Sequence, residues 1–249
     1  MTGSLPVLAV IPARYASTRF PGKPLAPIAG TPMVVRVWER ARQATTVDHV
    51  VVATDDERIA AVCREHGIDC EMTSATHATG TDRLAEVAER RPAGIYVNVQ
   101  GDEPLIDPAS IDVVVDALQR VRDSGIEVST CYLEEASPEQ CADSSVVHLV
   151  PGLDGCVMTF TRLPVPLDFA ESAPRRIHVG MFAFTAAALA RFQAWERGPV
   201  ERAESIELIR VIEHGERIAC APVPPGSIGV DRPEDVALVE AALAAESAR

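Results

Sequence analysis

The first half of the chain alternates between short apolar runs and amphipathic stretches. Residues 7–11 form a continuous apolar run, as in strands that are covered on both faces. The stretch at 33–43 has apolar residues at helical spacing, and the alternation then repeats. The predicted strands are 7–11, 47–53, 68–72 and 95–99, and the predicted helices are 33–43, 56–66, 81–89 and 108–123. Strands that alternate with helices in this way predict a parallel α/β sheet.

After residue 127 the pattern becomes that of antiparallel or mixed strands. The predicted strands there are 128–133, 146–149, 156–161, 178–184 and 218–223, and the predicted helices are 185–195, 200–214 and 232–245. Residues 143–176 have the character of an inserted lobe or a dimer arm. We therefore predict one domain over 1–249, with a mainly parallel central sheet and a smaller mixed-strand lobe at 128–184.

Composition and charge exclude several classes of function. The chain of 249 residues has a net charge of −13 and a pI near 4.9, which argues against a general nucleic-acid or anionic-membrane surface. No run approaches the roughly 20 apolar residues that cross a bilayer, and residues 1–6 do not resemble a signal peptide. The six cysteines show no CxxC spacing. These features predict a reduced, cytoplasmic protein.

Lys23 is the only lysine in the chain, and the other 22 of the 23 basic side chains are arginines. It lies with Arg14 and Arg19 in a loop directly after the first strand. A compact ammonium on a flexible stem suits a phosphate group, and the alternative is a solvated lysine at a turn. The loop matches neither GxGxxG nor GxxxxGKS, which disfavours NAD binding and P-loop hydrolysis. It therefore predicts a triphosphate that is held by side-chain charge.

Carboxylates lie where the parallel strands end. The segments 13–23, 54–56 and 98–104 each follow a predicted strand and should border one crevice. Asp102 is a candidate Mg²⁺ ligand because nucleotide-bound Mg²⁺ takes one or two carboxylates plus phosphate oxygens; the alternative is a turn residue. Asp231 offers a second carboxylate, or else an N-cap for the last helix.

One further turn leads into a predicted helix. Residues 77–83 read HATGTDR. The hydroxyls and backbone N–H groups of this turn can hold a ribose or a phosphate at the helix N-terminus. Alternatively, Thr79 and Thr81 simply cap the helix.

Five segments taken together resemble one known family. VIPARYASTRFPGKPL, VVVATDD, HATGTDRLAE, VNVQGDEP and GVDRPED occur in this order. They resemble the CMP-Kdo synthetases, the 3-deoxy-manno-octulosonate cytidylyltransferases, over nearly the whole chain. The resemblance implies an α/β nucleotidyltransferase-type Rossmann-like fold, CTP as donor, Mg²⁺ as cofactor, a homodimer, and release of pyrophosphate. It also implies that the lobe at 128–184 serves acceptor binding and dimerisation.

The resemblance also implies roles for individual residues. The implied CTP contacts are Ala13, Arg14, Ser17, Arg19, Lys23, Met72, Thr73, Thr81, Gln100 and Asp102. The implied acceptor contacts are Arg83, Gln100, Arg162, His178 and Glu207, and the implied metal ligands are Asp102 and Asp231. Lys23, Arg14 and Asp102 are the expected catalytic residues, because the acceptor attacks the α-phosphorus in line and charge grows on the leaving pyrophosphate.

Departures from the family pattern gather on the acceptor side. Phe182 and Phe184 stand where the family has tyrosines, Leu208 where it has a glutamine, and His148 where it has a lysine. A site built to bond hydroxyls loses much when such groups are dropped. This asymmetry predicts a small, anionic acceptor such as phosphonoformate, as in a phosphonate-pathway member of the family. The alternative acceptor is Kdo itself.

Three other functions fit less well. An NAD-dependent oxidoreductase lacks its glycine motif here, and a UTP- or GTP-dependent sugar-1-phosphate nucleotidyltransferase lacks a GGxGxRL-like loop. A nucleotide binder without turnover is disfavoured because Lys23, Asp102 and Asp231 are all retained.

Overall fold

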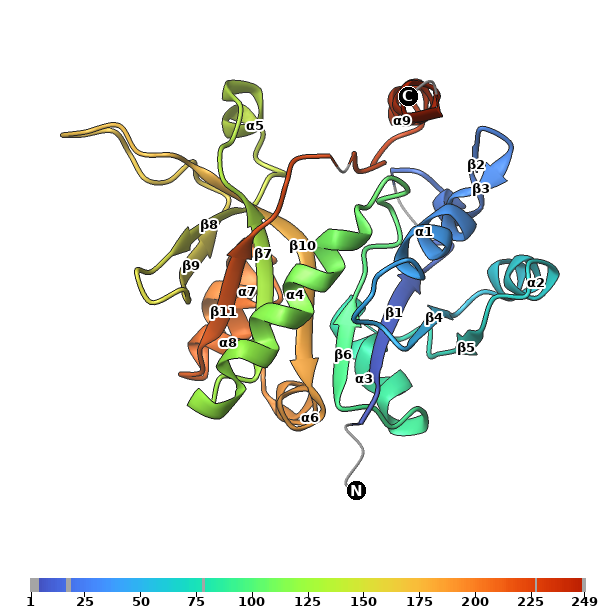
Figure 1. Cartoon of the computed structure of the whole chain (residues 1–249), viewed down its shortest axis with the longest axis horizontal. Coiled ribbons are helices and arrows are strands. Elements are labelled where there is room, and N and C mark those ends of the chain that lie inside the picture. The colour runs from blue at the N-terminus through green and yellow to red at the C-terminus, as the bar shows by residue number, and fades with distance from the viewer. Residues whose placement is uncertain (1–4, 17–18, 78, 227, 248–249) are drawn as a thin grey trace. The chain divides into compact units, whose positions relative to one another are not determined.

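The computed structural model describes residues 5–16, 19–77, 79–226 and 228–247. The chain divides into two compact units (Figure 1). Unit 1 comprises Met1–Asp112 and Gly226–Arg249, and unit 2 comprises Val113–Pro225. The predicted lobe at 128–184 falls inside unit 2. No helix within the described ranges is both long and apolar enough to cross a membrane.

Unit 1 is built on the predicted parallel sheet. Its strands are β1 (Val7–Ala13), β4 (His49–Thr54), β5 (Cys70–Met72) and β6 (Ile95–Asn98), in the spatial order β6-β1-β4-β5. β1 pairs in parallel with both β4 and β6. Ala9, Val10 and Ile11 are fully buried, which confirms the expectation of a strand covered on both faces.

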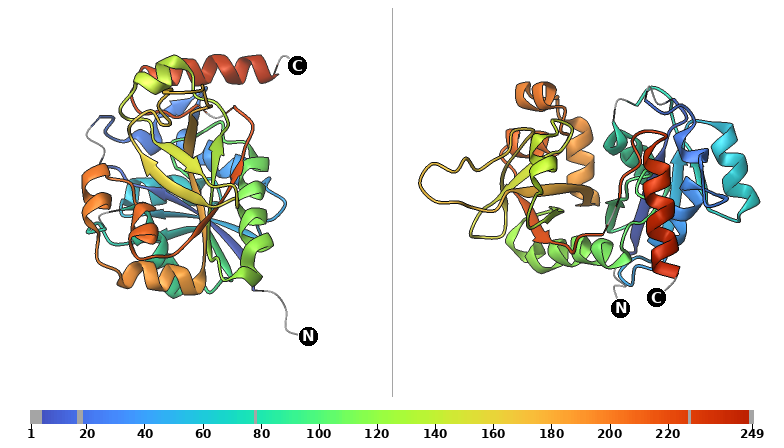
Figure 2. Two further views of the ribbon diagram at one scale, coloured as in Figure 1. Left: turned by 90° about the vertical axis from the view of Figure 1, so that its left-hand side faces the viewer. Right: turned by 90° about the horizontal axis from the view of Figure 1, so that it is seen from above.

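Helices complete unit 1. They are α1 (Met33–Ala41), α2 (Glu57–Glu65), α3 (Gly80–Arg90), the start of α4 (Pro108–Val121) and α9 (Asp235–Ser247). Short elements that the sequence pattern did not predict precede α1: η1 (Lys23–Leu25), β2 (Pro27–Ile28) and β3 (Thr31–Pro32). In Figure 2 the red helix α9 lies beside the blue N-terminal segments, and Glu240 accepts a 2.7 Å hydrogen bond from the Ala29 amide.

Helix α9 begins later than predicted. The expected start was residue 232, but the helix begins at Asp235. The Asp235 carboxylate accepts hydrogen bonds from the backbone amides of Asp231 and Arg232, both at 2.8 Å. These bonds hold the preceding residues as a turn outside the helix.

Unit 2 contains the predicted mixed strands. They are β7 (Val128–Leu133), β8 (His148–Pro151), β9 (Val157–Thr161), β10 (Arg176–Thr185) and β11 (Ile218–Pro222). β11 runs parallel to β7, whereas β7–β10, β10–β8 and β8–β9 are antiparallel. The remaining elements are the end of α4, η2 (Arg122–Ser124), α5 (Pro138–Ala142), α6 (Ala186–Ala194), α7 (Pro199–Glu204) and α8 (Ile209–Glu213). The α/β fold with a mainly parallel sheet and a mixed-strand part is thus confirmed.

The prediction of one helix over 200–214 is wrong. The helix stops at Ser205, which adopts a left-handed conformation with φ of 54°, and a new helix begins at residue 209. The break brings Glu201 and Arg210 together in a buried ion pair with bonds of 2.7 and 2.8 Å. In one continuous helix these residues would stand about 14 Å apart along the axis, so the pair requires the break.

Candidate active site

Lys23 lies at the meeting point of three segments of unit 1. Its Nζ donates to Asp102 Oδ2 at 2.7 Å and to the Val230 carbonyl at 2.8 Å, and it lies 3.6 Å from Asp231 Oδ1. The lysine side chain is only 14% exposed. A solvated lysine at a turn therefore does not describe this residue.

Asp231 is held by cations of the same loop. Its Oδ2 accepts a 3.0 Å hydrogen bond from Arg19 Nη1. At this end of α9, the carboxylate that bonds backbone amides is that of Asp235. The Asp231 carboxylate thus contacts the cations of Arg19 and Lys23, which agrees with a role in a site for charged ligands better than with an N-cap.

Backbone contacts fix the loop that carries Asp102. A Cβ atom on Gly101 would lie 2.5 Å from the Pro12 carbonyl oxygen, so only glycine permits this approach of the loop after β6 to the end of β1. The Val230 amide donates to the Asp102 carbonyl at 2.9 Å. The ends of β1 and β6 therefore meet the segment before α9, as expected for strand ends that share one edge of a sheet.

The donor set fits a nucleotide-bound Mg²⁺. Within the described ranges, no three His, Cys, Asp or Glu side chains gather into a group able to hold a metal ion. Two carboxylates do converge on one ammonium, those of Asp102 and Asp231. A site with two carboxylates suits Mg²⁺ that takes its remaining ligands from phosphates and water.

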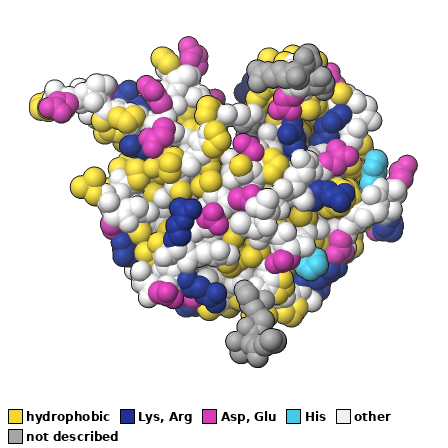
Figure 3. All heavy atoms as spheres, viewed as in Figure 1, with side chains coloured by type: hydrophobic (Ala, Val, Ile, Leu, Met, Phe, Trp, Pro, Cys, Tyr) yellow, Lys and Arg dark blue, Asp and Glu magenta, His cyan; other side chains and the backbone are white. Residues whose placement is uncertain are grey.

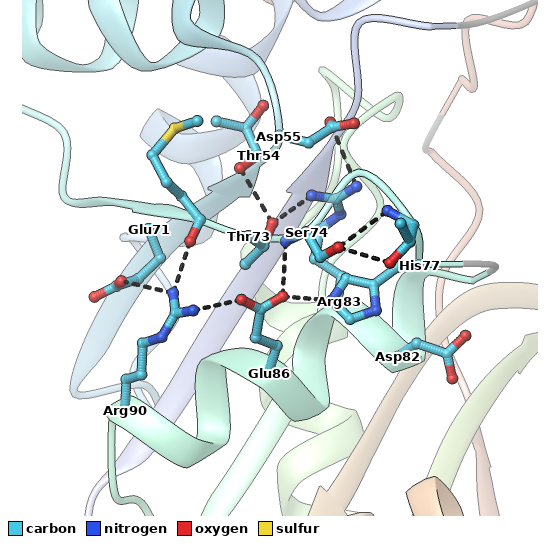
Figure 4. Close-up of polar contacts among 12 residues, drawn as sticks. Thr54, Asp55, Glu71, Thr73, Ser74, His77, Asp82, Arg83, Glu86 and Arg90 are labelled. Carbon is cyan, nitrogen blue, oxygen red and sulfur yellow. Dashed lines mark hydrogen bonds and ion pairs between the residues drawn. The ribbon is translucent and has the colours of Figure 1, made fainter.

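A second polar cluster surrounds Arg83 at the ends of β4 and β5 (Figure 4). The buried guanidinium of Arg83 donates to the Thr73 hydroxyl and lies 3.4 Å from Asp55 Oδ1. Thr73 Oγ1 in turn donates to the Thr54 carbonyl at 3.1 Å. Burial lowers the pKa of Arg83, the charges of Asp55 and Glu86 oppose this shift, and the positive charge of Arg14 adds to it. The positive charges of Arg14 and Arg83 are therefore close enough in unit 1 to affect each other.

Helix α3 also fixes the chain directly after β5. Glu86 accepts a 2.8 Å hydrogen bond from the Ser74 amide and pairs with His77 and Arg90. Arg90 donates to the Met72 carbonyl at 2.6 Å. Burial alone would raise the pKa of Glu86, but the bonds from Ser74 and His77 and the charge of Arg90 leave it below its ordinary value. The 72–74 segment is thus held from three points.

The other predicted CTP residues are spread along the same strand ends. Ala13 is buried at the end of β1, Thr81 is buried in the first turn of α3, and Gln100 is half-buried after β6. Thr79 forms a capping box with Asp82, so its hydroxyl serves as a cap as the alternative proposed. Ser17 lies outside the described residues.

The acceptor-side residues of unit 2 make contacts within that unit. The Arg162 guanidinium donates to the carbonyl oxygens of Glu204 at 2.7 Å and Ser145 at 2.9 Å. These bonds give Arg162 a role in joining β9 to the turn after α7. Glu207 is half-buried in the turn between α7 and α8.

His178 is held as a neutral imidazole. Burial lowers its pKa to about 4. Its Nε2 lies 2.8 Å from the Thr130 hydroxyl, which donates its own proton to the Met181 carbonyl at 2.7 Å. Because that hydroxyl proton is already used, Nε2 is the nitrogen that carries hydrogen. The free lone pair is therefore on Nδ1.

The four positions that were expected to depart from the family pattern lie in the interior. Phe182, Phe184, Leu208 and His148 are all buried in unit 2. The rings of Phe182 and Phe184 pack edge to face at 5.8 Å, and Phe184 packs on Phe192 at 5.3 Å. The packing of unit 2 thus accounts for phenylalanine at both positions. This burial removes the ground on which a small phosphonate acceptor was expected.

Comparison with known proteins identifies the family. A family model described as cytidylyltransferase matches residues 8–218. A 3-deoxy-manno-octulosonate cytidylyltransferase of Syntrophotalea carbinolica is 43% identical over 247 residues, which cover 95% of this chain and 98% of that protein. The protein of the same name from Geobacter metallireducens is 46% identical over 242 residues, with coverage of 92% and 94%. This chain belongs to the CMP-Kdo synthetase family. A solved CMP:2-keto-3-deoxy-manno-octonic acid synthetase complexed with CTP matches this family member with a TM-score of 0.90 at 37% identity, covering 97% of this chain and 99% of that one.

Membership of the CMP-Kdo synthetase family confirms the predicted cytidylyltransferase class and the nucleotidyltransferase fold. The names of the relatives favour the alternative acceptor and give no support to a phosphonate-pathway member. The contacts of Asp55 with Arg83 and of Glu86 with the chain after β5 were not predicted from the sequence. The VVVATDD and HATGTDRLAE segments carried both residues, but nothing in their spacing showed which side chains they meet.

Proposed function

We propose that this protein transfers CMP from CTP to Kdo and releases pyrophosphate. The observation that carries the proposal is the position of Lys23, whose ammonium meets Asp102 and lies near Asp231 in a chain of the CMP-Kdo synthetase family. The relative complexed with CTP supports CTP as the donor. Kdo as acceptor is supported by the names of the curated relatives.

The triphosphate would bind against the loop after β1. Arg14 and Arg19 are exposed there, and Lys23 is held at the inner end of the loop. These cations would offset the charge that develops on the leaving pyrophosphate. The cytosine would lie at the 72–74 segment, where Arg83, Glu86 and Arg90 fix the backbone.

Asp102 and Asp231 would hold Mg²⁺, and both residues fit that role by their convergence on Lys23. When bound, Mg²⁺ supplies Lewis-acid stabilisation of phosphate charge. The protein's own residues would orient the α-phosphate toward the acceptor, so that the acceptor oxygen attacks the α-phosphorus in line. Such positioning supplies several kcal/mol of the barrier, in order-of-magnitude terms.

We also propose that the protein is a homodimer. The 162–175 segment of unit 2, hereafter the arm, exposes Leu163, Leu167 and Phe169. Figure 3 shows yellow hydrophobic side chains on this projecting segment, which lies at the left of Figure 1. A second copy of the chain is the occupant that would cover them, since exposed apolar patches mark interaction surfaces.

Pyrophosphate release tests the function. The purified enzyme with CTP and Mg²⁺ should release pyrophosphate when Kdo is added and should form CMP-Kdo, whereas UTP in place of CTP should support little turnover. Phosphonoformate should give no release. Turnover with phosphonoformate and none with Kdo would restore the phosphonate interpretation. No release with any acceptor, despite CTP binding, would indicate a binder without turnover.

Asp102→Asn tests the metal site. This variant should remain folded and lose the metal-dependent rate.

A further inference from the structure

Tyr15 lies under the guanidinium of Arg58, at the base of the loop after β1 that carries Arg14, Arg19 and Lys23. Arg58 Cζ is 3.2 Å from the centre of the Tyr15 ring. The guanidinium is itself fixed by Asp56, which accepts from Nε at 2.9 Å and from Nη2 at 2.7 Å. The same carboxylate accepts from the Arg58 amide at 2.9 Å and caps helix α2. The cation above the ring is therefore anchored to the start of a helix.

Gly22 also lies against the Tyr15 side chain. A Cβ atom there would stand 3.2 Å from three atoms of the Tyr15 ring and hydroxyl, and the glycine has a φ of +73°. Its amide donates to the Tyr15 carbonyl at 3.0 Å. Tyr15 and Gly22 thus close the base of the loop, with Arg14 directly before the one and Lys23 directly after the other.

We propose that Tyr15 and Arg58 are positioning residues for the triphosphate. They hold the base of the loop closed, so that Arg14 and Lys23 are already placed when the nucleotide arrives. An unordered loop of cations would lose conformational freedom on binding, and ordering it beforehand raises affinity without a new contact to the ligand. This inference rests on the proposed function, which assigns no part to either residue.

The competing interpretation is an ordinary surface ion pair. Arg58 is 59% exposed, and its bond to Asp56 is local to the first turn of α2. That interpretation predicts no change in the KM for CTP when Arg58 is replaced by alanine. The positioning role predicts a weaker affinity for CTP with little change in the rate at saturation, because bound CTP itself places Arg14 and Lys23 and only the cost of ordering them is added.

The experiment compares Arg58→Ala, Tyr15→Ala and Tyr15→Phe with the wild type. Arg58→Ala should raise KM for CTP about two- to fivefold, the range of an exposed cation–π contact. Tyr15→Ala should raise it more, and Tyr15→Phe, which keeps the ring, should stay near the wild type. In all three variants kcat should change less than twofold. Arg64→Ala is the matched control, because Arg64 lies on the same helix and pairs with Glu57.

A second measurement does not depend on activity. Trypsin cleavage after Arg14 and Arg19 without nucleotide, followed by mass spectrometry, reports the order of the loop. Cleavage should be faster in Arg58→Ala and Tyr15→Ala than in the wild type or Arg64→Ala. A wild-type KM and a wild-type cleavage rate in both alanine variants would overturn the inference while leaving cytidylyl transfer intact. A wild type that neither binds nor uses CTP would instead refute the proposed function, and the positioning role with it.

Discussion

At the scale of single residues, Lys23 serves as counterion to two carboxylates. Its ammonium bonds Asp102 and lies near Asp231, which Arg19 also holds. The two proposed metal ligands are therefore partly neutralised by cations of the loop that would bind the triphosphate. A nucleotide that attracts these cations would leave the carboxylates free for the metal. Binding of nucleotide and binding of Mg²⁺ should then favour each other.

Replacing Lys23 should affect catalysis and metal binding in opposite directions. Lys23→Met should lower kcat/KM by about 10²-fold or more, as loss of a preorganised charge does. It should also tighten Mn²⁺ binding in the absence of CTP, because two carboxylates lose their shared counterion. Electron paramagnetic resonance titration with Mn²⁺ measures this affinity directly. Arg64→Met serves as control, and unchanged Mn²⁺ affinity in Lys23→Met would refute the counterion role.

His178 should make the protein less stable in acid. Its folded pKa of about 4 lies below the ordinary value of 6.5, because burial disfavours the cation. Between these two values the unfolded chain binds a proton that the folded protein excludes. Stability therefore falls as pH drops from 6.5 toward 4, and this group contributes nothing above that window. His148, whose pKa is also lowered by burial, acts in the same direction.

Urea unfolding at several pH values measures this effect. Between pH 7 and pH 4 the wild type should lose up to about 3 kcal/mol more than His178→Gln, in which this position no longer titrates. The glutamine amide can still donate to Thr130, which limits the structural damage. Equal losses in the two proteins would show that the histidine is already solvated in the fold.

At the scale of elements, strand β10 packs its aromatic side chains into unit 2. Phe184→Tyr would place a hydroxyl at a fully buried position that is lined by Phe182 and Phe192. A buried hydroxyl without a partner costs about 1–3 kcal/mol. We expect that loss in chemical unfolding and no gain in Kdo turnover. A variant of Phe184 with improved Kdo use would return its ring to the acceptor site.

Elements whose cause is local could be predicted from the sequence. The runs at β1, β4 and β6 are apolar because both faces are covered, and the turn at Gly101 closely follows β6. The break between α7 and α8 could not be predicted, because the apolar spacing continues across it. What ends α7 is the left-handed Ser205 and the ion pair between Glu201 and Arg210, which forms only in the fold.

The candidate site divides in the same way. Asp102 and Lys23 could be predicted, because each lies in a charged loop that follows a strand. The role of Phe182 and Phe184 could not be predicted. A phenylalanine looks the same in a sequence whether its ring faces a ligand or packs into the interior. Burial decides the matter, and burial depends on segments remote in the chain.

At the scale of the whole molecule, positive charge is concentrated in one loop of an acidic chain. The chain carries a net charge of −13, yet its only lysine and two of its arginines gather in the loop after β1. An acidic surface repels free nucleotides in general, so binding should depend on this loop. A distributed basic surface is not needed for a ligand that enters one site.

The arm should hold two copies of the chain together. Leu163, Leu167 and Phe169 are 67%, 78% and 101% exposed, and all three lie within one short segment. Burying these side chains against a partner would contribute about 1.5–3 kcal/mol each. We expect a dimer in sedimentation at micromolar concentration, and a monomer when Leu167→Asp and Phe169→Asp are combined.

Leu238→Asp is the matched control, since this leucine of α9 is 60% exposed but lies in unit 1, away from the arm in the sequence. A wild type that sediments as a monomer, or a double variant that stays dimeric, would show that the arm's apolar surface has another purpose.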